Sequence, residues 1–125
     1  MTPFGAKMRE LRAQRGVTLK EMAAALGVSA AYLSALEHGR RGRPSWWLVQ
    51  SIISYFNIIW DEAEELAELA RLSHPKVSID TRGLSPRATL LANVLAERIG
   101  ELSDDDLRAM LRIAQRRARP PRRAK

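Results

Sequence analysis

Cysteine is absent from this sequence of 125 residues. Without thiols the chain forms no disulfide, no thiolate nucleophile and no cysteine-based zinc site, and it suits a reducing compartment. The two histidines, His38 and His74, lie in separate contexts with no second ligand at metal spacing. No glycine-rich phosphate loop follows a strand, and no serine sits in a nucleophile elbow. We therefore expect neither an enzyme nor a protein that needs a metal or another cofactor.

Long apolar runs are also missing. No stretch reaches the length of a membrane-spanning helix, and no signal-peptide pattern opens the chain. The net charge of +7 and the isoelectric point near 10.8 indicate a polyanionic partner. Nucleic acid fits these features better than a membrane does, so we expect a cytoplasmic, nucleoid-associated protein.

The positive charge is concentrated at the two ends of the chain. Basic and acidic residues number 8 and 3 in residues 1–43, 3 and 6 in residues 44–86, and 10 and 5 in residues 87–125. Part of the first excess is a run of arginines, Arg40, Arg41 and Arg43. Such a run alone is more often a solvated loop than a binding site, but this one directly follows a helical segment that fits a DNA groove.

Residues 17–45 have the pattern of two short helices joined by a tight turn. Thr18 can cap the first helix and Gly27 can end it, while Ser29 can cap the second. The apolar positions of the first helix repeat at helical spacing: Leu19, Met22, Ala23 and Leu26. The second helix can bury Leu33 and Leu36. Small side chains cover its other face, so duplex DNA could approach it closely through the major groove.

The segment 7–58 resembles the lambda-repressor-like, or Cro/XRE, helix-turn-helix family. The resemblance lies in MRELRAQRGVTLKEMAAALGVS, in the YLSALEHG run and in the arginine loop that ends at Pro44 and Ser45. It implies an all-α fold with a compact bundle of five helices. It also implies that residues 30–38 form the recognition helix and that the partner is double-stranded DNA.

The resemblance implies roles for individual residues. Arg12 matches the basic residue that pairs with an acid at the end of the recognition helix, here Glu37. We prefer a partly buried pair to two solvated charges, because an unpaired Glu37 would repel phosphate. The base-reading positions match Ala30, Ala31, Tyr32 and Ala35. Since three of these are alanines, we expect readout through thymine methyl groups, Tyr32 and DNA shape.

Other positions are expected to hold the DNA backbone. Leu19 replaces the family's phosphate-binding glutamine, which leaves Thr18, Lys20 and backbone amides for that role. The arginine run is expected to contact phosphate or to enter the minor groove. The predicted DNA-binding residues are Thr18, Lys20, Ser29, Ala30, Ala31, Tyr32, Ser34, Ala35, His38, Arg40, Arg41 and Arg43.

Two further helices are predicted before residue 73. The first opens at Pro44 and Ser45 and ends near Asn57, with its core formed by Trp47, Leu48, Ile52, Ile53 and Phe56. The second spans residues 60–72 and carries a row of acids that should face away from DNA. The three tryptophans, Trp46, Trp47 and Trp60, could stack on bases, but their apolar helical surroundings favour core packing.

The rest of the chain has a different organisation. Residues 73–85 indicate a linker or a short extended strand. Ser85 then caps a helix that reaches Gly100, and Ser103 caps a last one. Three aspartates in the first turn of that last helix favour capping over metal binding. The apolar stripes of the two helices are expected to mediate dimerisation: Leu90, Leu91, Val94, Leu95, Ile99, Leu107, Met110 and Leu111.

We therefore predict a DNA-binding domain at 1–73, a linker at 74–84, a helical hairpin at 85–118 and a basic disordered tail at 119–125. Two short amphipathic helices cannot close a core alone, which favours a homodimer over docking back onto the first domain. The predicted function is a transcriptional regulator, a repressor that binds an inverted-repeat operator. The alternative is an antitoxin-like or adaptor protein whose hairpin binds another protein. The tail would attract phosphate or keep the chain soluble.

Overall fold

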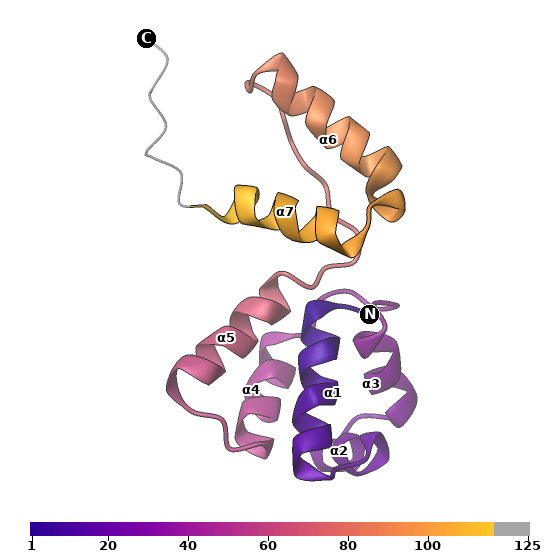
Figure 1. The fold of residues 1–125 in the computed structure, drawn as a ribbon. Coiled ribbons are helices and arrows are strands. Elements are labelled where there is room, and N and C mark those ends of the chain that lie inside the picture. Colours follow the sequence, from indigo (N-terminus) through magenta and orange to yellow (C-terminus); the bar gives the residue numbers. More distant parts are fainter. Residues whose placement is uncertain (117–125) are drawn as a thin grey trace. The chain divides into compact units, whose positions relative to one another are not determined.

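The computed structural model describes residues 1–116, and that part of the chain contains only helices (Figure 1). The predicted all-α fold is thus confirmed, and residues 73–85 form no strand. The predicted tail at 119–125 and the last two hairpin residues lie outside the described part. The helices are α1 (Pro3–Arg15), α2 (Leu19–Leu26), α3 (Ala30–Glu37), α4 (Trp46–Tyr55), α5 (Trp60–Arg71), α6 (Pro86–Arg98), the short 3-10 helix η1 (Ile99–Glu101) and α7 (Asp104–Gln115).

The chain divides into two compact units, Met1–Ser78 and a second unit that begins at Ile79. This boundary falls within residues 74–84. None of the helices in the described part is long and apolar enough to cross a membrane.

Helices α1 to α5 form the first unit. Helix α1 packs against α3 and α5, α2 packs against α3 and α4, and α4 packs against α5 (Figure 1). Every one of these helices contributes to a single core, whose largest buried side chains are Phe4, Met8, Leu11, Met22, Leu33, Leu36, Ile52, Phe56 and Leu66. Burial of these apolar side chains is the main stabilising term.

The predicted helix caps are confirmed. Thr18, Ser29 and Ser45 each accept a hydrogen bond from the backbone N–H three residues later, at 3.0, 3.0 and 3.1 Å. Gly27 ends α2 with φ +74°, a left-handed conformation that glycine adopts without strain. The helix ends fall within two residues of the predicted positions.

The start of the chain is fastened to the end of α3. The backbone N–H of Thr2 donates to the carbonyl of Glu37 at 3.2 Å, and that of Phe4 donates to the buried Ser73 hydroxyl at 2.9 Å. A Cβ atom on Gly5 would lie 2.2 Å from the Glu37 carbonyl oxygen. Only glycine therefore allows α1 to approach α3 this closely.

The predicted core packing of the tryptophans is wrong. Trp46, Trp47 and Trp60 are 67%, 75% and 82% exposed. The buried residues of α4 are Leu48, Val49 and Ile52, and Phe56 follows them in the core. Helical spacing places Trp47 with Gln50, Ser51 and Ser54, which is the polar side of that helix.

The second unit consists of α6, η1 and α7, with α6 and α7 diverging from η1 (Figure 1). Ser85 and Ser103 cap the two helices as predicted, and Asp106 completes a capping box with Ser103. No residue of α6 or α7 is buried. The large apolar side chains left exposed on these elements are Leu90, Leu91, Val94, Ile99, Leu111 and Ile113. Over residues 79–116 this unit has no core of its own.

Candidate nucleic-acid interface

Helices α2 and α3 form a compact helix-turn-helix. They are the most extensively contacting helix pair, and the turn between them is closed by the Val28 N–H, which donates to the Ala23 carbonyl at 3.0 Å. Leu33, Leu36 and Glu37 are buried against the rest of the unit. This burial fixes which side of α3 remains available to a partner.

The available side of α3 carries small side chains. Ala30 and Ala31 are exposed, while Ser34 and Ala35 are half-buried. No side-chain hydrogen-bonding group is present at three of the four expected base-reading positions, because they are alanines. The face can approach another surface closely but offers few directed polar contacts.

Arg12 and Glu37 meet behind this face. The Arg12 Nη2 atom lies 2.5 Å and 2.9 Å from the two carboxylate oxygens of Glu37, and Glu37 is 1% exposed. One nitrogen thus makes both hydrogen bonds, while the buried Arg12 Nε has no partner within residues 1–116. The pair joins α1 to the last turn of α3 and neutralises the only acid of the recognition helix.

A capping box closes the start of α2. The Thr18 hydroxyl accepts from the Glu21 N–H and donates to the Glu21 carboxylate, each at 3.0 Å, and the Glu21 carboxylate also accepts from the Thr18 N–H at 3.4 Å. The polar groups of Thr18 are therefore engaged within the capping box. Lys20 is exposed and remains available to a phosphate.

The loop after α3 carries three cations. Arg40, Arg41 and Arg43 are all exposed. The guanidinium carbon of Arg41 lies 5.5 Å from the centroid of the Tyr32 ring, a cation–π distance. His38 caps the C-terminus of α3, and its Nδ1 lies 2.8 Å from the Ser34 carbonyl. Since a carbonyl only accepts hydrogen bonds, this contact is a hydrogen bond when Nδ1 carries a proton.

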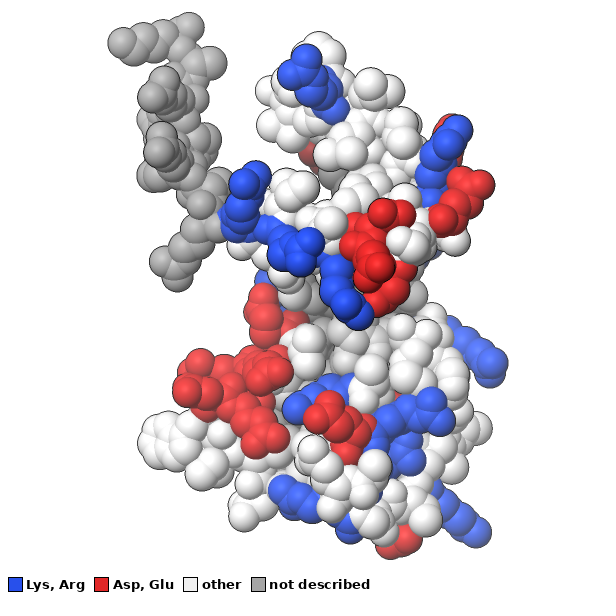
Figure 2. All heavy atoms as spheres, in the orientation of Figure 1, with Lys and Arg blue, Asp and Glu red and all other residues white. Residues whose placement is uncertain are grey.

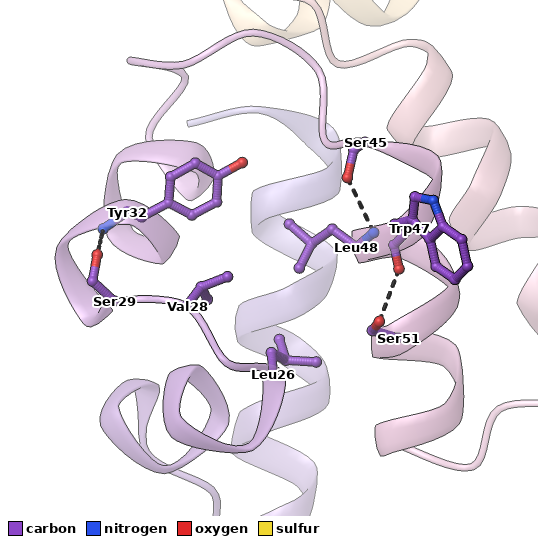
Figure 3. Close-up of a pocket in the computed structure, with 8 residues that line it drawn as sticks. All are labelled: Leu26, Val28, Ser29, Tyr32, Ser45, Trp47, Leu48 and Ser51. Atoms are coloured by element: carbon purple, nitrogen blue, oxygen red, sulfur yellow. Dashed lines mark hydrogen bonds between the residues drawn. The ribbon is translucent and has the colours of Figure 1, made fainter.

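A cleft of about 410 Å³ separates the start of α3 from the start of α4 (Figure 3). Tyr32 projects from α3 across this cleft toward the segment that carries Ser45 (Figure 3). The remaining lining residues are Leu26, Val28, Ser29, Trp47, Leu48 and Ser51. Tyr32 is consequently half-buried and faces α4, unlike the exposed alanines that precede it.

Trp47 is the surface residue that the sequence interpretation missed. Trp47 is among the residues that line both this cleft and a second one of about 480 Å³ between α2 and α4. The polar positions Gln50, Ser51 and Ser54 carried the signal, because they repeat with Trp47 at helical spacing.

A row of five acidic residues in the first unit lies on another helix, α5. Asp61, Glu62, Glu64, Glu65 and Glu68 are all exposed on α5, and Figure 2 shows their acidic side chains gathered there. A hydrogen bond from Arg71 holds the pKa of the Glu68 carboxyl below its usual value. These carboxylates contribute no acid to α3 or to the arginine loop.

Known proteins resemble this chain in the same region. A family model described as a helix-turn-helix domain matches residues 3–58, which span α1 to α4 and the turn after it. An HTH-type transcriptional regulator from Deinococcus deserti, DdrOP3, is 34% identical over 116 residues, which cover 91% of this chain and 82% of the relative. That similarity therefore extends into the second unit.

Two relatives from Bacillus subtilis match shorter stretches. The HTH-type transcriptional regulator RghRB is 33% identical over 61 residues, covering 49% of this chain and 44% of the relative. The HTH-type transcriptional repressor RghR is 46% identical over 44 residues, covering 35% of this chain and 33% of the relative. With its five-helix unit and its arginine loop, the chain belongs to the helix-turn-helix family of DNA-binding transcriptional regulators.

Proposed function

We propose that the protein is a homodimeric repressor that binds an inverted-repeat operator with α3 in the major groove. The observation that carries this proposal is the small-residue face of α3, on which Ala30 and Ala31 are exposed, followed directly along the chain by the exposed arginine loop. A groove-sized helix with flanking cations matches the shape and the charge of duplex DNA. The name of the RghR relative supports the repressor role.

The contacts are divided between bases and backbone. Ala30, Ala31 and Ala35 approach the base edges, where methyl groups favour thymine. Lys20 and the arginines of the loop hold the phosphates, and the backbone amides at the start of α2 support them. Specificity then depends on apolar contacts and on DNA deformability more than on hydrogen bonds.

Replacing Arg40, Arg41 and Arg43 together with alanine should weaken binding to every DNA sequence. Each phosphate contact that is lost should reduce the slope of log K against log salt by about 0.9. Fluorescence anisotropy with operator and with random duplex, over a series of salt concentrations, measures both quantities. The triple variant Arg82→Ala, Arg87→Ala and Arg98→Ala is the control, because it removes the same charge outside the helix-turn-helix. An equal loss of slope in both variants would refute the assignment of the loop.

Dimerisation is supported by the second unit. Helices α6 and α7 bury none of their own residues, and together with η1 they leave six large apolar side chains exposed. Association of two copies would cover this surface, and each CH₂ group buried contributes about 0.8 kcal/mol. A dimer also places two recognition helices on half-sites about 34 Å apart, so the second contact becomes effectively intramolecular.

Leu91→Glu should convert the dimer to a monomer, because it places a charge in the apolar stripe of α6. Sedimentation equilibrium would show halved mass, and operator affinity should fall at least about tenfold as avidity is lost. Ala96→Glu is the matched control, since it adds the same charge on the opposite, exposed side of α6. The opposite result is an unmodified chain that is a monomer and that dimerises, or binds DNA, only when another protein is added. That result would replace this proposal with the antitoxin-like or adaptor function.

A further inference from the structure

We infer that Tyr32 does not read a base itself but positions Arg41 against a phosphate at the edge of the major groove. This inference rests on the proposed function, because it concerns the same DNA interface. It gives Tyr32 a positioning role and Arg41 the contact with the phosphate. Without it, the two residues would count as independent contacts with DNA. The recognition helix and the arginine loop then form one phosphate contact together, with Tyr32 holding Arg41.

The first step of the argument is the direction of the Tyr32 side chain. Its ring crosses the cleft toward the start of α4 and is half-buried there (Figure 3). Ala30 and Ala31, in contrast, are exposed on the side of α3 that is free to enter a groove. Tyr32 therefore lines the wall between α3 and α4, where a DNA backbone would pass as α3 occupies the groove.

The second step is the position of Arg41. Its guanidinium carbon lies 5.5 Å from the Tyr32 ring centroid, within the range in which the ring quadrupole attracts a cation. A long exposed side chain in a loop otherwise samples many rotamers, and fixing it costs conformational entropy on binding. Holding Arg41 on the ring before DNA arrives removes part of that cost.

The third step concerns geometry at the phosphate. A guanidinium presents five N–H donors in one plane, and Arg41 remains exposed beside the ring, so donors are open to a phosphate. Ser29 and Ser45 cap α3 and α4 on the walls of the same cleft, so the positive ends of two helix dipoles lie near the site. An anion beside Arg41 is therefore favoured over a neutral base edge.

A double-mutant cycle on DNA binding tests the inference. Arg41→Ala should weaken operator binding and reduce the salt slope by about 0.9 in the unmodified protein. In the Tyr32→Leu background the same change should cost about threefold less affinity, because Arg41 is no longer held in place. In the Tyr32→Phe background, which keeps the ring and removes the hydroxyl, Arg41→Ala should cost the full amount.

Nuclear magnetic resonance of the free protein gives a readout that does not depend on DNA. The Arg41 Cδ protons should show an upfield ring-current shift in the unmodified protein and in Tyr32→Phe, and lose it in Tyr32→Leu. Thermal unfolding of Tyr32→Leu checks that the helix-turn-helix still forms. The pair of Tyr32 with Arg40 is the control cycle and should be additive.

The outcomes separate this inference from the function on which it rests. If Arg41→Ala costs the same in the unmodified and Tyr32→Leu proteins, the two residues act independently and the inference is wrong. A Tyr32→Phe variant that loses selectivity between operator sequences without a change of salt slope would make Tyr32 a base reader. If Arg41→Ala leaves DNA affinity unchanged while Arg40→Ala and Arg43→Ala lower it, the inference fails and the DNA interface stands. If none of these three substitutions lowers DNA affinity, the proposed interface fails.

Discussion

Arg12→Ala should lower the free energy of unfolding by about 3 to 5 kcal/mol, because it leaves a buried carboxylate without its partner. Glu37 is 1% exposed and both of its carboxylate oxygens accept hydrogen bonds from Arg12. A small domain is stable by only about 5 to 15 kcal/mol, so the variant should lose a large share of its stability. Chemical denaturation followed by circular dichroism measures the change.

Two control variants test the cause of this loss. Arg12→Lys should lose less, because a single nitrogen makes both hydrogen bonds in the native pair and Nε makes none within residues 1–116. Replacing Arg12 and Glu37 together with methionine should restore much of the stability, since no buried charge remains. A double variant as unstable as Arg12→Ala would show that packing, and not the unpaired charge, dominates.

The pair also matters for the recognition helix. Glu37 ends α3, and its backbone carbonyl accepts from Thr2 while Gly5 packs directly against it. Arg12 adds a side-chain anchor to these backbone contacts, so its loss should loosen the end of α3. Any reduction in DNA affinity of Arg12→Ala should be measured at a temperature at which the variant is folded.

Much of the fold follows from local signals in the sequence. Thr18, Ser29 and Ser45 are N-cap residues by type and by position, and all three cap helices in the structure. Apolar repeats at helical spacing likewise identify Met22, Leu33 and other core positions. These features depend on a few neighbouring residues, which is why a single sequence is enough to predict them.

The features that could not be predicted depend on tertiary packing. The need for glycine at position 5 arises because α3 passes over α1, 32 residues away in the chain. The exposure of Trp47 arises because Leu48, Val49 and Ile52 already fill the core side of α4. Hydrophobicity alone assigns a tryptophan to the core. Whether its side chain reaches the core depends on which face of its helix packs against the other helices.

The tie between Arg41 and Tyr32 is another contact that sequence alone does not indicate. Arg41 follows Tyr32 by nine positions, and the sequence alone does not give the path of the loop that carries Arg41. The arginine run predicts positive charge near the recognition helix, but it does not predict which arginine contacts Tyr32. Only the geometry distinguishes Arg41 from Arg40 and Arg43.

Ala31→Glu should reduce operator affinity by about 100-fold or more, because a like charge facing the groove costs several kcal/mol. Ala31 is exposed on α3, so the larger side chain also prevents the helix from approaching the bases. The fold should remain intact, since an exposed substitution changes stability by about 0.5 kcal/mol or less. Ala67→Glu is the matched control, because it adds the same charge to the exposed side of α5. Operator binding retained by Ala31→Glu, with unchanged unfolding of both variants, would show that another surface of the protein contacts DNA.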